Sequence, residues 1–288
     1  MRSLLAGVLL LVGALLVPVA TAGWWARETI VPAQTYVDTV APLAKDSAIT
    51  RAIETQVVDQ TMAAVRKQAP QLPAALRSRL KPLVRVVVRR VVATPAFAQA
   101  WRQANRTAHR QLVAVLTGRS AAVKSGPGST VEIRLSPFTR ALQQELSRAG
   151  VPFASQLRLP NTGAAIPIGP AQNLERARGA YQFLVRWGRW LPVLALVLIV
   201  VGLLLARRRA GALAWTAVVA LLGLGALALG LFLGRAQYLH ALPSAIPSPA
   251  GKAFFDTVTS GLRHDIEVVA VASALVLIVS AAVAVVRR

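Results

Sequence analysis

The chain lacks cysteine altogether and has little acidic charge: only 11 of its 288 residues are Asp or Glu. Without cysteine there is no disulfide, no thiolate nucleophile and no thiolate metal site. Few carboxylates remain for acid–base catalysis, and there is no G-x-S-x-G nucleophile elbow and no phosphate-binding or dinucleotide-binding glycine motif. We therefore expect no catalytic residues, no metal and no cofactor, and interpret the chain as a protein that is not an enzyme.

Apolar residues, in contrast, are abundant and are concentrated at the two ends of the chain. They make up 55% of the sequence, whereas soluble domains average about 45–50%. A segment of about 20 apolar residues, rising 1.5 Å per residue, crosses the hydrocarbon core of a bilayer. Four segments are predicted to do so: 4–26, 187–206, 210–234 and 266–286.

The first of these spans has two interpretations. As an uncleaved anchor it ends at Trp24 and Trp25, which suit a membrane interface. As a signal peptide it offers Arg2, an apolar run and the small residues Ala20 and Ala22 at a cleavage site. Both interpretations export the region after this span. Three regions are predicted: 1–26 as an N-terminal transmembrane anchor or signal peptide, 27–186 as a basic extracytoplasmic domain, and 187–288 as a three-helix transmembrane region with an external loop at 235–265.

The orientation is predicted from the arginines beside the spans, because short cytoplasmic segments are enriched in Lys and Arg. With the N-terminus inside, Arg2, the run 207–209 and the final pair Arg287 and Arg288 are all cytoplasmic. We therefore predict a multi-pass protein of the cell (plasma) membrane, with both termini cytoplasmic and the basic domain outside. This placement excludes nucleic acid as a partner.

The predicted spans have almost no ionisable residue at depth, whereas ion-coupled transporters need buried carboxylates or histidines. Transport by this chain alone is therefore disfavoured. The nearest titratable group, His264, Asp265 and Glu267, is interpreted as the solvated start of the fourth span, where acids are favourable at the positive end of the helix dipole.

A stripe of small residues, Ala226, Gly230 and Gly234, recurs every four positions in the third span. Such stripes let a neighbouring helix approach closely. We expect this one to pack the second, third and fourth spans together, with homodimerisation as the alternative.

The region between the first two spans is strongly basic and mostly helical. Residues 27–189 contain 24 Lys and Arg against 8 Asp and Glu, a net charge of +16. Helices are predicted over 47–68, 76–92 and 95–118, the first and third with Asp46 and Thr94 as N-caps, and over 136–150. Two strands are predicted at 130–135 and 164–168, and a last helix follows Pro170 and runs on to the second span. The fold class is mainly α: a polytopic helical membrane protein of about four spans with a helical extracytoplasmic domain carrying a small two-stranded β element.

Two of these helices are predicted to be amphipathic. The core stripe of the helix 76–92 is Leu76, Leu80, Leu83, Val84, Val87, Val88 and Val91, with Lys81, Arg85 and Arg89 on another face. The core stripe of the helix 95–118 is Phe97, Trp101, Ala104, Ala108, Leu112 and Val115, with Arg102, Arg106 and Arg110 opposite. The arginine faces are interpreted either as solvated or as contacts for anionic lipid headgroups or acidic envelope polymers.

The most distinctive stretch, 97–118, contains the pattern W-x-x-A-N-R-x-A-H, formed by Trp101, Ala104, Asn105, Arg106, Ala108 and His109. Together with the segments 40–44 and 255–258, it resembles a family of uncharacterised actinobacterial integral membrane proteins. The resemblance spans most of the chain. It implies one anchor, an external domain and C-terminal spans, and it implies no activity.

Within this pattern Asn105 and His109 lie one helical turn apart at the edge of the core stripe. They either hydrogen-bond to each other or jointly hold a ligand, and a polar pair in the core is the favoured interpretation. The candidate motif Trp101, Asn105, Arg106 and His109 is thus expected to be structural rather than functional. A metal site would need further ligands, and the other histidines are in a different segment.

These patterns together predict a non-enzymatic integral membrane protein of the cell envelope. Its predicted partners are the lipid bilayer and, through the basic domain, an anionic surface or an envelope protein. Two alternatives stand beside this prediction: a membrane-linked enzyme acting on lipid or cell-wall material, and an accessory subunit of a transporter or signalling complex.

Overall fold

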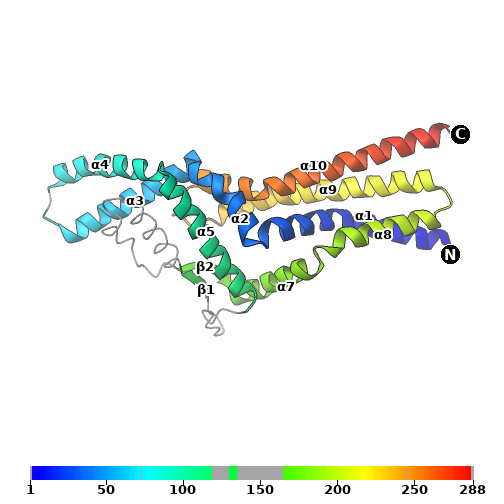
Figure 1. Cartoon of the computed structure of the whole chain (residues 1–288), viewed down its shortest axis with the longest axis horizontal. Coiled ribbons are helices and arrows are strands. Elements are labelled where there is room, and N and C mark those ends of the chain that lie inside the picture. The colour runs from blue at the N-terminus through cyan, green and yellow to red at the C-terminus, as the bar shows by residue number, and fades with distance from the viewer. Residues whose placement is uncertain (1, 72, 119–129, 135–164, 245, 287–288) are drawn as a thin grey trace. The chain divides into compact units, whose positions relative to one another are not determined.

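The computed structural model describes residues 2–71, 73–118, 130–134, 165–244 and 246–286, and these are mostly helical (Figure 1). They form two compact units. One comprises Met1–Pro32, Arg178–Tyr238 and Thr259–Arg288, and the other comprises Ala33–Ala177 and Leu239–Val258. The mainly helical class predicted from the sequence is confirmed.

Most of the apolar helical residues belong to the first unit. Helix α1 (Arg2–Trp25) continues into a π-helical turn, η1 (Ala26–Ile30), and the other long helices are α9 (Arg209–His240) and α10 (Ser248–Val286). These three segments are long and apolar enough to cross a membrane, and a helix suits hydrocarbon because it bonds its own backbone polar groups. By the length and composition of its helices the chain is a multi-pass membrane protein.

The second predicted span differs from expectation. Helices α7 (Ala171–Trp187) and α8 (Trp190–Leu205) are bent by 62° at a short break, and α8 has 16 residues. Gly188 lies in the break, where a Cβ atom would lie 2.5 Å from the Leu184 carbonyl oxygen of α7 and 3.1 Å from the Gly23 carbonyl oxygen of α1. The backbone at the break therefore requires glycine, and the predicted continuous helix from the domain into the membrane is wrong.

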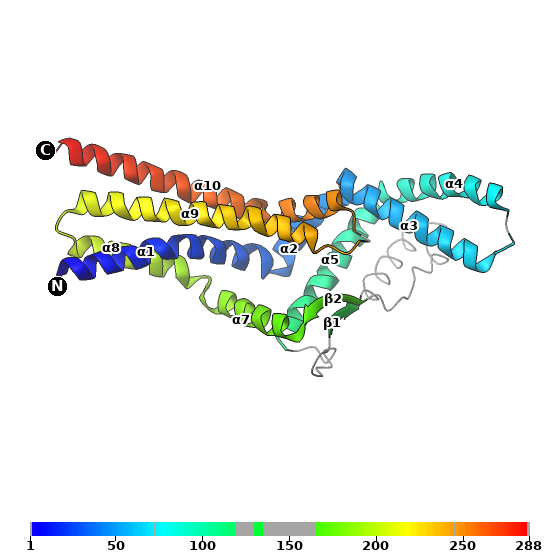
Figure 2. The same ribbon diagram turned by 180° about the vertical axis from the view of Figure 1, so that it is seen from behind.

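Helices α1 and α8 lie side by side and run antiparallel in both views (Figures 1 and 2). A Cβ atom at Gly13 would lie 2.8 Å from the Ile199 side chain, and one at Gly202 would lie 2.7 Å from the Leu10 side chain. Real Cβ atoms essentially never come so close. The two helices therefore pack at a distance that only glycine at these positions allows.

The small-residue stripe of α9 does not have its expected role. Ala226, Gly230 and Gly234 are exposed, and a Cβ atom at either glycine would meet nothing within 4 Å. α9 packs instead through Leu224, which is buried with Leu262 of α10. Residues two positions apart on a helix are about 200° apart around its axis. When Leu224 faces α10, Ala226 and the stripe that begins with it therefore face away from that contact. The homodimer alternative stays a prediction.

The second unit begins with α2 (Ala33–Val40) and the 3₁₀ turn η2 (Ala41–Lys45), followed by α3 (Ser47–Gln68), α4 (Ala74–Val92) and α5 (Pro95–Leu116). The predicted N-caps are confirmed. A side-chain oxygen of Asp46 accepts hydrogen bonds from the backbone N–H groups of Ala48 and Ile49, and the Thr94 hydroxyl accepts one from Phe97. These side chains satisfy N–H groups that the first turn leaves without partners.

A segment from the far end of the chain completes the core of this unit. Val40, Leu43, Ile49 and Ala250 are buried together. Ala250 belongs to the region predicted to be an external loop, and Phe254, on the first turns of α10, packs against the same cluster.

The predicted loop 235–265 is correspondingly much shorter in the structure. α9 continues to His240 and α10 begins at Ser248, so most of the predicted loop is helical. Pro249 lies in the first turn of α10, where its missing N–H has no helical partner to lose. The prolines therefore confine the break to a few residues instead of stiffening a long loop.

Two short strands, β1 (Thr130–Arg134) and β2 (Ala165–Pro170), pair antiparallel with a register shift between Val131 and Glu132. The two-stranded element as part of a folded domain remains a prediction, because residues 119–129 and 135–164 lie outside the described residues. The predicted helix 136–150 falls in that range as well.

The α1–α8 contact can be tested by adding side-chain atoms to it. Gly202→Val should force the helices apart and lower stability by about 1–3 kcal/mol, the usual cost of overpacking. Gly230→Val is the matched control, because nothing lies within 4 Å of its Cβ position. Thermal unfolding of the intact protein in detergent should show a lower midpoint for the first variant only, and equal midpoints would contradict the contact.

Candidate functional site

The motif residue Trp101 projects from α5 to the junction of α2 and η2. Its indole Nε1 donates a hydrogen bond of 2.9 Å to the carbonyl oxygen of Val40, and its ring packs against the cluster that contains Leu43 and Ile49. Ala104, one turn further on, is fully buried. Trp101 thus ties the backbone at the end of α2 to the core.

Asn105 and His109 have separate neighbours. The Asn105 amide donates a hydrogen bond of 2.9 Å to the Trp101 carbonyl oxygen one turn earlier. His109 is 5% exposed, and its ring lies 4.9 Å from that of Tyr36 on α2, with the ring planes tilted by 30°. Each of these contacts involves a different neighbour, and the hydrogen bond expected between Asn105 and His109 stays a prediction.

Arg106 reaches α2 by a different route. Its guanidinium donates a hydrogen bond of 2.8 Å to the Gln34 side-chain oxygen, and the Gln34 amide donates to both carboxylate oxygens of Asp38 at 3.0 and 3.1 Å. The four motif residues are thereby spread along the contact of α5 with α2 and its C-terminal end. None of these contacts resembles a catalytic arrangement, and the structural interpretation of the motif stays a prediction.

The core stripe predicted for α5 is partly displaced. Phe97, Ala104 and Val115 are buried as expected, but His109 is buried too and Leu112 is 36% exposed. The reason is that α5 packs with α2 on the His109 side, which the apolar pattern alone does not reveal.

The best-defined charge cluster joins α3 to α4. Glu54 on α3 is 8% exposed and accepts hydrogen bonds from the Arg89 guanidinium, while Arg85 lies 3.3 Å from the same carboxylate. One turn away, Lys81 lies 3.2 Å from Asp59. The pKa of Arg89 is raised because its guanidinium donates to Glu54 and because the carboxylate is negatively charged. Arg89 is therefore positive throughout the pH range in which the protein is folded.

This cluster was not predicted. The available signal was a pair of arginines at i and i+4, Arg85 and Arg89, facing a chain region with very few acids. Lys81, Arg85 and Arg89 of the basic face of α4 pair with acids of α3 while remaining largely exposed to solvent.

The apolar stripe predicted to be the core of α4 is divided in the structure. Leu80, Val84, Val88 and Val91 are partly buried, whereas Leu76, Leu83 and Val87 are 46%, 62% and 44% exposed. Where side chains of α4 are described, none is fully buried. The prediction that the whole stripe forms a core is therefore wrong for Leu76, Leu83 and Val87, which lie on the outward face.

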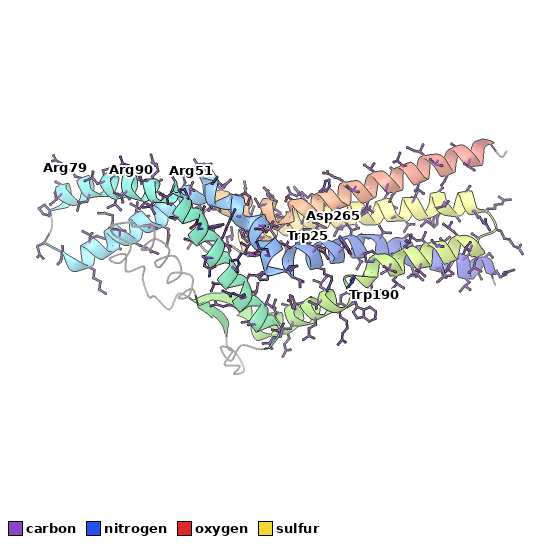
Figure 3. The ribbon with its side chains drawn as sticks, in the orientation of Figure 1. Trp25, Arg51, Arg79, Arg90, Trp190 and Asp265 are labelled. Carbon is purple, nitrogen blue, oxygen red and sulfur yellow. The ribbon has the colours of Figure 1, made fainter. Side chains whose placement is uncertain are left out.

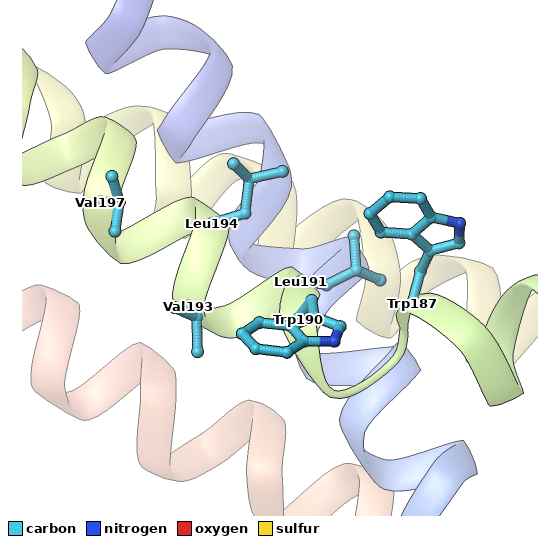
Figure 4. A pocket seen from close by; sticks show the side chains of 6 residues that line it. All are labelled: Trp187, Trp190, Leu191, Val193, Leu194 and Val197. Carbon is cyan, nitrogen blue, oxygen red and sulfur yellow. The ribbon is translucent and has the colours of Figure 1, made fainter.

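A hollow of about 340 Å³ lies on α8 beside the bend from α7 (Figure 4). Trp187 and Trp190 line it together with Leu191, Val193, Leu194 and Val197. No polar side chain among them would orient a small ligand. About half of each indole is exposed, as suits Trp at the interface of a membrane.

The cluster His264, Asp265 and Glu267 is not at a helix start. α10 begins at Ser248, so these residues lie well inside the helix and the dipole argument does not apply. His264 and Glu267 are exposed. Within the described residues no group of three or more His, Asp or Glu could hold a metal ion.

Comparison of the chain with protein-family models, with curated proteins and with solved structures finds no match. The resemblance to an actinobacterial membrane-protein family therefore stays a prediction.

The anchoring role of Trp101 can be tested by removing only its hydrogen bond. Trp101→Phe keeps most of the packing but leaves the Val40 carbonyl oxygen without its donor, which should cost about 1–3 kcal/mol. Gln99→Ala, an exposed position on α5, is the control. Thermal unfolding followed by circular dichroism should show a lower midpoint for Trp101→Phe alone, and an unchanged midpoint with altered ligand or lipid binding would assign the motif to a functional site.

Proposed function

We propose that the chain is a non-enzymatic integral membrane protein of the cell envelope whose basic domain, residues 27–186, binds an anionic surface. The observation that carries this proposal is the way the acids are used. Asp46 caps α3, Asp38 accepts from Gln34, and Glu54 and Asp59 pair with residues of α4. The acids between Asp38 and Asp59 are thus already bonded.

The basic residues, in contrast, outnumber these acids and are largely exposed. Among them are Arg51, Arg79, Arg90, Arg102 and Arg110. Each Lys or Arg close to an anionic membrane surface contributes about 1 kcal/mol of attraction. Several such residues on one domain are therefore enough for measurable binding at low salt.

The proposed placement outside the membrane depends on α8 being the fourth span. The α1–α8 contacts run from Leu10 beside Gly202 to Gly23 beside Leu191. The 13 helical steps between Leu10 and Gly23 cover about 20 Å along the axis of α1, so α8 follows α1 through most of the hydrocarbon and crosses wherever α1 crosses. The same glycine contacts support an anchor that is retained in the mature protein rather than removed as a signal peptide.

With four spans, the arginines of residues 207–209 and the two termini share the cytoplasmic side, as the excess of Lys and Arg in short cytoplasmic segments favours. The membrane proposed is the cell (plasma) membrane. The accessory-subunit and enzyme alternatives lack a specific structural observation in their favour.

This topology can be tested with single cysteines, because the native chain has none. Ser78→Cys on exposed α4 should react with an impermeant maleimide in intact cells, whereas Ser3→Cys at the start of α1 should react only after lysis. Neither change alters a charge that sets orientation. The reverse pattern of labelling would place the basic domain in the cytoplasm and would refute the proposal.

Binding can be tested with the intact protein in nanodiscs of zwitterionic lipid. We expect these to float with vesicles rich in phosphatidylglycerol at low salt and to release them at about 1 M salt, where the Debye length falls to about 3 Å. Empty nanodiscs and zwitterionic vesicles are the controls. Absence of flotation, or flotation that salt does not weaken, would contradict electrostatic binding.

A further inference from the structure

Helix α4 has two different basic faces. Its sequence contains six Lys and Arg and no acid. Three of them, Lys81, Arg85 and Arg89, are paired with acids of α3. Arg79 and Arg90 form no ion pair with a described residue, and in Figure 3 both project from the edge of α4 that faces away from α3.

The outward face also carries three exposed apolar side chains. Leu76, Leu83 and Val87 succeed one another at intervals of seven and four residues, so they lie on one side of the helix. Arg79 follows Leu76 by three positions and Arg90 follows Val87 by three. The outward face is therefore an apolar stripe with an arginine near each end.

The three kinds of surface that this face could contact make different demands. An acidic polymer would attract the arginines but would leave the exposed leucines and valine in water. A second copy of α4 would bring together two helices that carry six positive residues each and no negative ones. A bilayer with anionic lipids suits both parts, because the apolar residues enter the boundary between headgroups and acyl chains and the arginines reach the phosphates.

We propose that α4 is an interfacial helix whose outward face, Leu76, Arg79, Leu83, Val87 and Arg90, lies on the anionic bilayer in which the chain is anchored. The inference rests on the proposed function and specifies the surface that makes the contact. The ion pairs with Glu54 and Asp59 orient the helix, because they hold the face with Lys81 and Arg85 towards α3.

The test uses Leu83→Cys, labelled with an environment-sensitive fluorophore, in the intact chain reconstituted into vesicles. In vesicles rich in phosphatidylglycerol we expect a blue shift of the emission and several-fold protection from a water-soluble quencher. In zwitterionic vesicles we expect neither. Ser78→Cys is the matched control, because it is exposed on the same helix but about 140° away from Leu83, and its label should stay in water in both.

The arginines are tested in the labelled protein. Arg79→Gln combined with Arg90→Gln should lower the ratio of inserted to exposed label by about thirtyfold. The control pair Arg66→Gln and Lys67→Gln makes the same change of charge at exposed positions near the end of α3 and should leave the ratio nearly unchanged. Circular dichroism of every variant checks that the helices are retained.

Two outcomes would overturn the inference. A Leu83 label that stays in water in anionic vesicles, while the nanodiscs still bind such vesicles, would keep the proposed function and exclude α4 as the contact with its own membrane. An equal decrease in the ratio of inserted to exposed label for the two double variants would show a diffuse electrostatic attraction without an interfacial helix. Failure of the nanodisc binding as well would reject the proposed function itself.

Discussion

Glycine at positions 13, 23 and 202 lets α1 and α8 approach until the side chains of one helix contact the backbone of the other. The proposed topology depends on this contact, because α8 has only 16 residues while about 20 are needed to cross a bilayer unaided. The proposal that α8 spans the membrane therefore rests on its packing against α1 and not on its length. At the bend, a side chain on Gly188 would meet the Leu184 carbonyl oxygen of α7 and then the Gly23 carbonyl oxygen of α1. The proposed position of the basic domain outside the membrane therefore depends on these glycine contacts between α1 and α8.

Electrostatics arranges the second unit in a comparable way. A mostly buried carboxylate is costly unless it is paired, so Glu54 selects the arginines that must face α3. Because α4 is a rigid helix, fixing one face fixes the opposite one. Leu76, Leu83 and Val87, which the sequence pattern assigns to a core, are then turned outward together with Arg79 and Arg90. The two acids of α3 thereby create the surface on which the functional proposal depends.

Three residues of the W-x-x-A-N-R-x-A-H pattern contact α2 or its C-terminal end. Trp101 holds the end of α2 through Val40, His109 stacks on Tyr36, and Arg106 extends to Gln34. Each contact needs a particular side-chain shape and donor, which supports the structural interpretation of the motif. The pattern is visible in the sequence, but the partners of Trp101, Arg106 and His109 are not, because they lie 61 to 73 positions earlier in the chain.

Local physical chemistry was readable from the sequence alone. The long apolar helices, the caps at Asp46 and Thr94 and the positive charge of the middle region depend on residues close in sequence or on composition, and the structure places the helices where these signals indicated. The face that each helix buries was decided by tertiary structure. Ala226, Gly230 and Gly234 are exposed, Ala250 joins a core formed by residues about 200 positions earlier, and Leu83 faces outward. A periodic pattern shows that a helix has two faces, but the neighbour that each face contacts is set by which helices pack together.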